Sequence, residues 1–239
     1  MATRSRRNPV EPRLSRQSNV RQLFWVVIGA IVLYVVLDAI AQSLPPHYSP
    51  VRDAESDLAV GPYGYIMAIN FLNRGALSLI FLYALSKITR ANGGLESMGV
   101  GRSFRIGVYV FAVWAVGAIL LAFFPTDVPA TPVSWHGAIH LVVAALAFFG
   151  GAFGALLLSL QFGKNRALQG AKRLARLIAI LSVVLLLVGL VSIAGPIGGL
   201  TERMFLGSVL LWVAVVAIYL ARWTPETGEV AGQLGGPRR

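Results

Sequence analysis

Two histidines four positions apart have the spacing in this sequence that most directly suggests chemistry. His136 and His140 share one face if their segment is helical. Two imidazoles on one helical face can ligate one metal ion, and a carboxylate can complete the set. Asp127 lies shortly before them, so His136, His140 and Asp127 form a hypothetical zinc site. The alternative is that both histidines are interfacial residues that hydrogen-bond the adjoining loop.

A second candidate is Ser56, which lies between Glu55 and Asp57 in a polar segment. A serine becomes an effective nucleophile when a base lies close to it. The candidates for that base are the three histidines of the chain, His47, His136 and His140. Ser56 and Asp127 are the candidate catalytic residues of a hydrolase, in which Asp127 would be a ligand or base and Ser56 would polarise the carbonyl. The alternative is a helix cap, because serine and acidic side chains satisfy free N–H groups at the start of a helix.

A third group of polar residues lies inside or beside long apolar segments: Asp38, Asn70, Arg74 and Glu202. Asn70 and Arg74 are four positions apart and share a helical face. Because ionisable groups within a membrane usually pair and face the bundle interior, we expect a contact between Asp38 and Arg74. The four residues are candidate binding residues of a polar pocket. The alternative is a polar clasp that joins the first two helices.

The elements that must position these side chains are six long apolar segments. Hydrophobic residues make up 56% of the 239 residues and charged residues only 13%, whereas soluble domains carry about 25% charged residues. A run of about 18 or more apolar residues can cross a bilayer as a helix. The predicted spans are residues 23–44, 62–88, 106–124, 136–162, 177–197 and 204–221. The expected fold is therefore an all-α bundle of six transmembrane helices.

The polar ends of the chain complete the predicted domain organisation. We expect a disordered basic arm over residues 1–21, a transmembrane domain over 22–221 and a tail over 222–239. Ala39-Ile40-Ala41 resembles a signal-peptide cleavage site, so cleavage of residues 1–41 stays open. The apolar segment is long for a signal peptide and Asp38 interrupts it, which favours a retained first span. Before the last span, residues 198–203 are expected to form a tight turn.

Basic residues predict the orientation of the bundle. Of the 21 lysines and arginines, 18 lie in the arm, the tail and the second and fourth connections. Arg52 and Arg203 lie in the other connections. Because basic connections stay on the cytoplasmic side, both termini are predicted to be cytoplasmic in a bacterial plasma membrane. The net charge of +11 therefore indicates the lipid bilayer as partner and no nucleic acid.

Several classes of function find no support in the sequence. The chain has no cysteine, which excludes disulfides, thiolate metal sites and cysteine nucleophiles. It has no phosphate loop, dinucleotide fingerprint or zincin motif, so nothing supports an ATP-driven or nicotinamide-dependent function. Gly150 and Gly154 have the spacing that lets two helices approach closely. We expect packing within the chain at this face, with a homo-oligomer as the alternative.

Four motifs lie next to the predicted spans. They are Ser56-Asp57-Leu58, Phe124-Pro125-Thr126-Asp127, His136-Gly137-Ala138-Ile139-His140 and Gly199-Leu200-Thr201-Glu202-Arg203. Together they resemble the DUF998 family of bacterial and archaeal membrane proteins over residues 23–221. The resemblance implies six helices and no assigned activity. The family's Ser, Asp and His set is similar to that of alkaline ceramidases and adiponectin-type receptors, which hold zinc with three histidines. This chain lacks a third histidine within a span, because His47 lies in a connection.

Three functional hypotheses follow from the sequence. The leading one is an outward-facing polar pocket that binds a lipid headgroup or a small ligand. The second is a metal-assisted hydrolase, with zinc as the hypothetical cofactor, that acts on a lipid or an amide. The third is a small transporter in which Asp38 and Arg74 relay charge, although no span is interrupted at mid-depth as transporter sites often require. Whether the chain is an enzyme stays open.

Overall fold

The protein is described here by a computed structural model, which places residues 11–45, 47–91, 101–128 and 131–223. Within these residues the chain forms six long helices and no strand. They are α1 (Glu11–Ser43), α2 (Gly64–Ala91), α3 (Gly101–Leu121), α4 (Trp135–Gln161), α5 (Lys172–Ser192) and α6 (Gly198–Arg222). Each is long and apolar enough to cross a membrane. The predicted all-α class with six spanning helices is confirmed.

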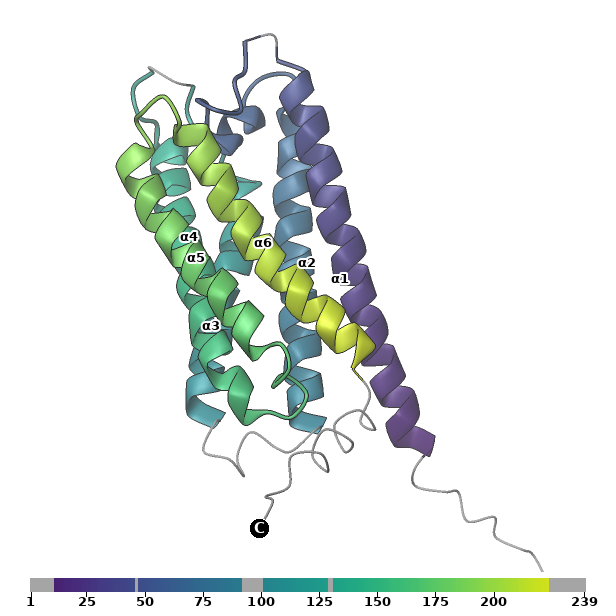
Figure 1. Ribbon diagram of the computed structural model, residues 1–239. Coiled ribbons are helices and arrows are strands. Elements are labelled where there is room, and N and C mark those ends of the chain that lie inside the picture. Colours follow the sequence, from purple (N-terminus) through teal and green to yellow (C-terminus); the bar gives the residue numbers. More distant parts are fainter. Residues whose placement is uncertain (1–10, 46, 92–100, 129–130, 224–239) are drawn as a thin grey trace, which may run out of the picture.

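The helices form a closed bundle (Figure 1). Each helix contacts the next one along the chain, and α6 also contacts α1, which closes the ring. Helix α6 touches α2 and α4 as well, so it lies deeper in the bundle than the others. Helix α1 begins and α6 ends at the same end of the bundle (Figure 1).

The two ends of the bundle carry different connections. One end holds the short 3-10 helix η1 (Glu55–Ala59) and the starts of α4 and α6; we call it the cap end. The other end holds the 3-10 helix η2 (Phe162–Lys164) and the starts of α3 and α5; we call it the basal end. Every candidate site residue from the sequence except Asn70 and Arg74 lies in or near the connections of the cap end.

An aromatic cluster around Trp212 of α6 forms the centre of the bundle. The Trp212 ring lies 5.2 Å from that of Phe111, 5.5 Å from that of Phe81 and 6.1 Å from that of Phe162, measured between ring centroids. Its indole N–H donates to Ser159 Oγ at 2.8 Å. Lipid tails are as apolar as these side chains, so close packing and hydrogen bonds are the forces that hold helices together in a bilayer. The cluster therefore fixes α6 against α2, α3 and α4.

Glycines of α4 allow α3 to approach closely. A Cβ added at Gly150 would lie 2.8 Å from the Val110 carbonyl oxygen, and one at Gly154 would lie 2.5 Å from Phe111 N. Both distances are too short for a real side chain, so α3 covers this face of α4. The structure uses the Gly150/Gly154 face within the chain, and the face is not free for the homo-oligomer considered as the alternative.

Three helix starts differ from the sequence expectations. Helix α1 begins at Glu11, inside the predicted arm, and Pro12 lies in its first turn, where proline is tolerated. Helix α5 begins at Lys172 and includes basic residues that were assigned to a connection. The expected tight turn over residues 198–203 is wrong, since these residues open α6. The reason is tertiary: the Arg52 and Val51 carbonyls accept hydrogen bonds from N–H groups in this first turn.

Candidate functional site

The connection between α1 and α2 folds over the cap end and docks on the start of α6. Gly199 N donates to the Arg52 carbonyl at 3.2 Å, and Leu200 N donates to the Val51 carbonyl at 2.9 Å. A Cβ at Gly199 would overlap the Asp53 carbonyl, so only glycine fits at this contact. The connection is therefore attached to the bundle by backbone contacts that no side-chain pattern in the sequence reveals.

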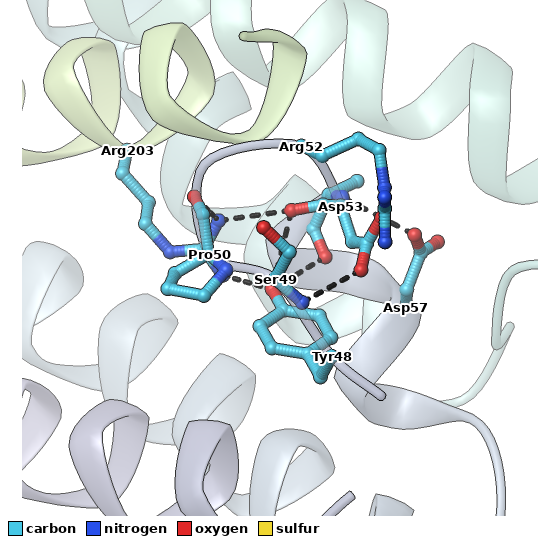
Figure 2. Close-up of polar contacts among 8 residues, drawn as sticks. Tyr48, Ser49, Pro50, Arg52, Asp53, Asp57 and Arg203 are labelled. Atoms are coloured by element: carbon cyan, nitrogen blue, oxygen red, sulfur yellow. Dashed lines mark hydrogen bonds and ion pairs between the residues drawn. The ribbon is translucent and has the colours of Figure 1, made fainter. Parts of the chain in front are cut away.

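Arg203 of α6 clamps this connection (Figure 2). Its Nη1 donates to the Pro50 and Asp53 carbonyls at 3.0 Å each, and its Nη2 donates to the Tyr48 hydroxyl. The guanidinium also lies over the Tyr48 ring, 5.4 Å from its centroid. Burial raises the pKa of the Tyr48 phenol, which keeps it neutral. Arg203 thus holds the connection through three acceptors and one aromatic face.

Two carboxylates order the connection from within (Figure 2). Asp53 accepts from Arg52 Nε at 2.9 Å and from Ser49 N at 2.7 Å. The hydrogen bond from Arg52 holds the pKa of Asp53 below its usual value. Asp57 accepts from Ala54 N at 3.2 Å, and burial raises its pKa. These contacts fix the start of η1, which points Glu55 into the bundle.

Glu55 and Arg74 form an ion pair in the interior. Glu55 Oε2 lies 3.4 Å from Arg74 Nη1, and each residue is 1% exposed. The Tyr34 hydroxyl donates to Glu55 Oε1, and the Glu55 backbone N–H donates to Glu202 Oε2 at 3.1 Å. The Arg74 guanidinium also lies 4.8 Å from the centroid of the Trp114 ring. The pair therefore joins α1, α2, α6 and η1 through one buried network.

Two asparagines of α2 support this network from the side of α1. Asn70 Nδ2 donates to the Tyr34 carbonyl at 3.2 Å, and Asn73 Nδ2 donates to the Ala30 carbonyl at 2.9 Å. Side-chain hydrogen bonds between helices are a common way to join spans in lipid. Asn70 and Arg74, predicted as pocket residues, therefore lie in a packed contact between helices.

The expected contact between Asp38 and Arg74 is wrong. Arg74 pairs with Glu55, while Asp38 accepts a hydrogen bond from Gln42 Nε2 at 2.5 Å. The physical reason is that η1 inserts the Glu55 carboxylate between the first two helices, where it pairs with Arg74 Nη1. Asp38 lies instead on the side of α1 that faces α6.

A groove of about 350 Å³ lies between α1 and α6. Its walls include Ile31, Val35, Leu206 and Leu210, and its polar residues include Asp38 and Arg203. Within the described residues, Asp38 Oδ1 and Arg203 Nε are buried without a hydrogen-bond partner. An unpaired buried polar atom is unfavourable by about 1–3 kcal/mol. Beside the groove there are thus one buried acceptor and one buried donor that lack a partner within the described residues.

Asp127 and the two histidines lie at another corner of the cap end, where α3 leads into α4. Asp127 accepts from Ser134 N at 2.9 Å and from Ser134 Oγ at 2.5 Å, and these bonds lower its pKa. Ser134 Oγ in turn accepts from Gly137 N at 3.1 Å as the N-cap of α4. His140 is 2% exposed and its Nδ1–H donates to the Phe124 carbonyl at 2.7 Å. This corner is a helix cap and a loop anchor.

The hypothetical hydrolase site is not assembled in the described part of the chain. No three His, Cys, Asp or Glu side chains among those residues come together in a group that could hold a metal ion. Asp127 and His140 bind Ser134 and Phe124, and His136 packs against Trp135. Ser56 forms no side-chain hydrogen bond with a histidine there, and His47 is exposed. The set of His136, His140 and Asp127 does not fit zinc in this arrangement.

Sequence reasoning missed four residues of the site: Tyr34 and Glu55 of the buried network, and Tyr48 and Arg203 of the clamp. Arg203 was counted only as a basic residue of a connection. Glu55 was assigned to a helix cap because it precedes a span, and a connection is normally hydrated. The sequence did indicate that a carboxylate must lie near Arg74, because this cation lies within an apolar span. It did not show which carboxylate that is. Nothing in the sequence indicated a role for either tyrosine, because tyrosines are common near membrane boundaries.

Comparison with known proteins covers nearly the whole bundle. The sequence profile of a family described as "Protein of unknown function (DUF998)" matches residues 27–219. The chain belongs to the DUF998 family. No curated protein and no solved structure matches it. The DUF998 match includes α2 to α5, parts of α1 and α6, η1, the Glu55–Arg74 pair, and Asp38 and Arg203 of the groove.

Proposed function

We propose that this DUF998 protein binds a zwitterionic phospholipid in the groove between α1 and α6. The observation that carries the proposal is the composition of the groove: apolar walls from two spanning helices, with one carboxyl and one guanidinium among its lining residues. A phospholipid with a primary amine has the matching parts. An acyl chain fits the apolar walls, the ammonium fits Asp38, and the phosphate fits Arg203.

The charges of the groove support a ligand that carries both signs. The ion pairs within the described residues are Arg52–Asp53 and Arg74–Glu55, so Asp38 and Arg203 line one cavity without pairing to each other. Arg203 Nε and Asp38 Oδ1 are buried and unpaired, so a phosphate that reached the first and an ammonium that reached the second would supply the missing hydrogen bonds. A volume of about 350 Å³ lies within the usual range of ligand sites.

The buried network supports the proposal by holding Arg203 in place. Its Nη atoms are occupied by Pro50, Asp53 and Tyr48, so the side chain is already ordered before a ligand binds. A preordered side chain loses little conformational entropy on binding, which favours affinity. In this proposal the connection from α1 to α2 positions Arg203 and leaves its Nε for the lipid.

The distribution of basic residues supports a placement of the groove on the outer side of the membrane. In the described residues, the basal end carries most of the lysines and arginines, and the cap end carries Arg52 and Arg203. By the positive-inside rule, the basal end and both termini are cytoplasmic and the cap end faces outward. The proposed ligand is thus a lipid of the outer leaflet of a bacterial plasma membrane.

The test is lipid retention measured by native mass spectrometry of the purified protein with phosphatidylethanolamine or phosphatidylcholine added. A Cβ at Gly207 meets no atom within 4 Å and Gly207 lines the groove, so Gly207→Phe fills it. Gly29→Phe is the matched control, because Gly29 on α1 also has open space but does not line the groove. We expect Gly207→Phe to lose phosphatidylethanolamine by about tenfold or more and Gly29→Phe to retain it.

The headgroup assignment has its own readout in the same assay. Phosphatidylcholine carries a quaternary amine that cannot donate a hydrogen bond to Asp38, so wild-type protein should prefer phosphatidylethanolamine. Asp38→Asn should reduce that preference. Equal retention of phosphatidylethanolamine by wild-type and Gly207→Phe protein would overturn the proposal.

A further inference from the structure

We propose a second lipid site at the basal end, where the start of α5 binds the phosphate of an anionic phospholipid. A cavity of about 460 Å³ lies there, lined by Gly163, Lys172, Arg173, Arg176 and Leu177. Three of these five residues are cations. The site is separate from the groove between α1 and α6 and does not depend on its function.

The charges of this cavity are unbalanced. Within the described residues, no carboxylate lies within ion-pair distance of Lys172, Arg173 or Arg176. Lys172 and Arg176 are four positions apart, and Arg173 and Arg176 are three apart, so all three reach the same side of the first turns. Cations this close repel one another, and a phosphate between them removes the repulsion while accepting several charge-assisted hydrogen bonds.

The start of α5 adds to the attraction for an anion. Ala171 occupies the N-cap position and makes no side-chain cap hydrogen bond, and Lys172 N donates only weakly to the Gln169 carbonyl, at 3.4 Å. A helix N-terminus carries a partial positive charge, which favours a phosphate beside it. The geometry therefore combines three side-chain cations, an uncapped helix start and a cavity in one place.

The surroundings of the cavity point to a lipid as the source of the phosphate. Helix α5 is a spanning helix from Lys172 onward, so the cavity lies where the apolar segment begins. Leu174 and Leu177, next to the cations, are exposed on the outside of the bundle. Acyl chains can pack there while the headgroup enters the cavity. Basic pockets at the cytoplasmic ends of spanning helices are known to bind anionic headgroups.

The competing explanation is that these cations only orient α5 against a negative membrane surface. That explanation depends on the charge of this end and not on the cavity. Lys164 and Arg166 allow the two to be separated, because both are exposed cations of the preceding connection and neither lines the cavity. Replacing either pair of cations by glutamine removes two positive charges from the same end.

The experiment compares Arg173→Gln/Arg176→Gln with the control Lys164→Gln/Arg166→Gln in the full-length protein. Phosphatidylglycerol is titrated into each purified protein, and bound lipid is measured by native mass spectrometry. We expect the cavity variant to weaken phosphatidylglycerol binding by about tenfold or more and the control to change it by less than about twofold. An equal loss in both variants would show an orienting role only and overturn the proposal.

Two further arms keep the result interpretable. Gly163→Phe fills the cavity and keeps every charge; its Cβ would lie 3.6 Å from Lys172 Cδ, an ordinary contact. It should also weaken phosphatidylglycerol binding, and unchanged binding in this variant would contradict the site. Inorganic phosphate should compete only weakly with phosphatidylglycerol for the wild-type protein. If phosphate competes as strongly as the lipid itself, the ligand of this site is a free anion and the proposal of a lipid site is overturned. Gly207→Phe should leave this binding unchanged, which separates this site from the groove.

Discussion

The cap end and the basal end of the bundle use cations in opposite ways. At the cap end, Arg203 is fixed by carbonyl groups, and Arg74 within the nearby network pairs with a carboxylate. At the basal end, Arg173 and Arg176 are exposed and have no carboxylate within ion-pair distance among the described residues. A buried charge must be satisfied by the protein itself, whereas a charge at the surface can be satisfied by lipid. The Nη atoms of Arg203 and Arg74 therefore hold the structure, and only Arg203 Nε is left for the proposed lipid, whereas Arg173 and Arg176 as a whole are free to bind.

Removal of Glu55 should have the largest effect on stability and would test this difference most directly. Glu55→Ala leaves Arg74 buried without a counter-ion, so the free energy of unfolding should fall by about 3–5 kcal/mol. Unfolding of the purified protein in mixed micelles measures the change. The matched basal variant Lys164→Gln should change it by less than about 0.5 kcal/mol. If Glu55→Ala lowers the free energy of unfolding no more than Lys164→Gln does, the proposed difference between the two ends is wrong.

A smaller effect is expected where the α1–α2 connection docks on α6. In Gly199→Ala the new methyl group overlaps the Asp53 carbonyl and forces the two backbones apart. Overpacking of this kind reduces the free energy of unfolding by about 1–3 kcal/mol. The control is Gly207→Ala in the same helix, where no atom lies within 4 Å of the added Cβ. Equal stability of the two variants would mean that the connection is not held by this contact.

The smallest effect concerns the carboxylates of the cap-end connections and their dependence on pH. The Ser134 hydrogen bonds hold the pKa of Asp127 below its usual value. The ionised Asp127 carboxylate therefore stabilises the fold at pH values above its unfolded-state pKa of about 3.9. This stabilisation is lost as the pH falls through the lower pKa that Asp127 has in the folded state. Asp127→Asn should lower the thermal midpoint at neutral pH, and its difference from the wild type should shrink below about pH 4.

Asp57 provides the contrast of opposite sign in the same measurement. Burial raises its pKa, so protonation favours the folded state and the ionised form opposes folding at neutral pH. Asp57→Asn should therefore lose less stability at neutral pH than Asp127→Asn. If both variants respond to pH in the same direction, the assignment of Asp127 as a hydrogen-bonded cap and Asp57 as a desolvated carboxyl is wrong.

Parts of the cap-end network could be read from the sequence. Arg74 within an apolar span indicated a buried ion pair, and Asn70 four residues earlier indicated a shared polar face. The choice of Asp38 as the partner of Arg74 was wrong, because proximity along two predicted helices does not show which faces meet. The histidine spacing likewise placed His136 and His140 on one helix face. It did not indicate their partners, which are Trp135 for His136 and the Phe124 carbonyl for His140.

The sequence by itself determined that most of the chain lies in a lipid bilayer, how many helices span it, and that basic residues gather at one end. These properties depend on apolar length and on local charge, which are written in consecutive residues. Only the tertiary structure decided that η1 sends Glu55 to Arg74, that Arg203 clamps the connection, and that Asp38 faces a groove. The physical reason is that a buried charge is satisfied by whichever partner the folded backbone brings within reach. Here the α1–α2 connection brings the partners together by docking on α6, and no local sequence pattern encodes that docking.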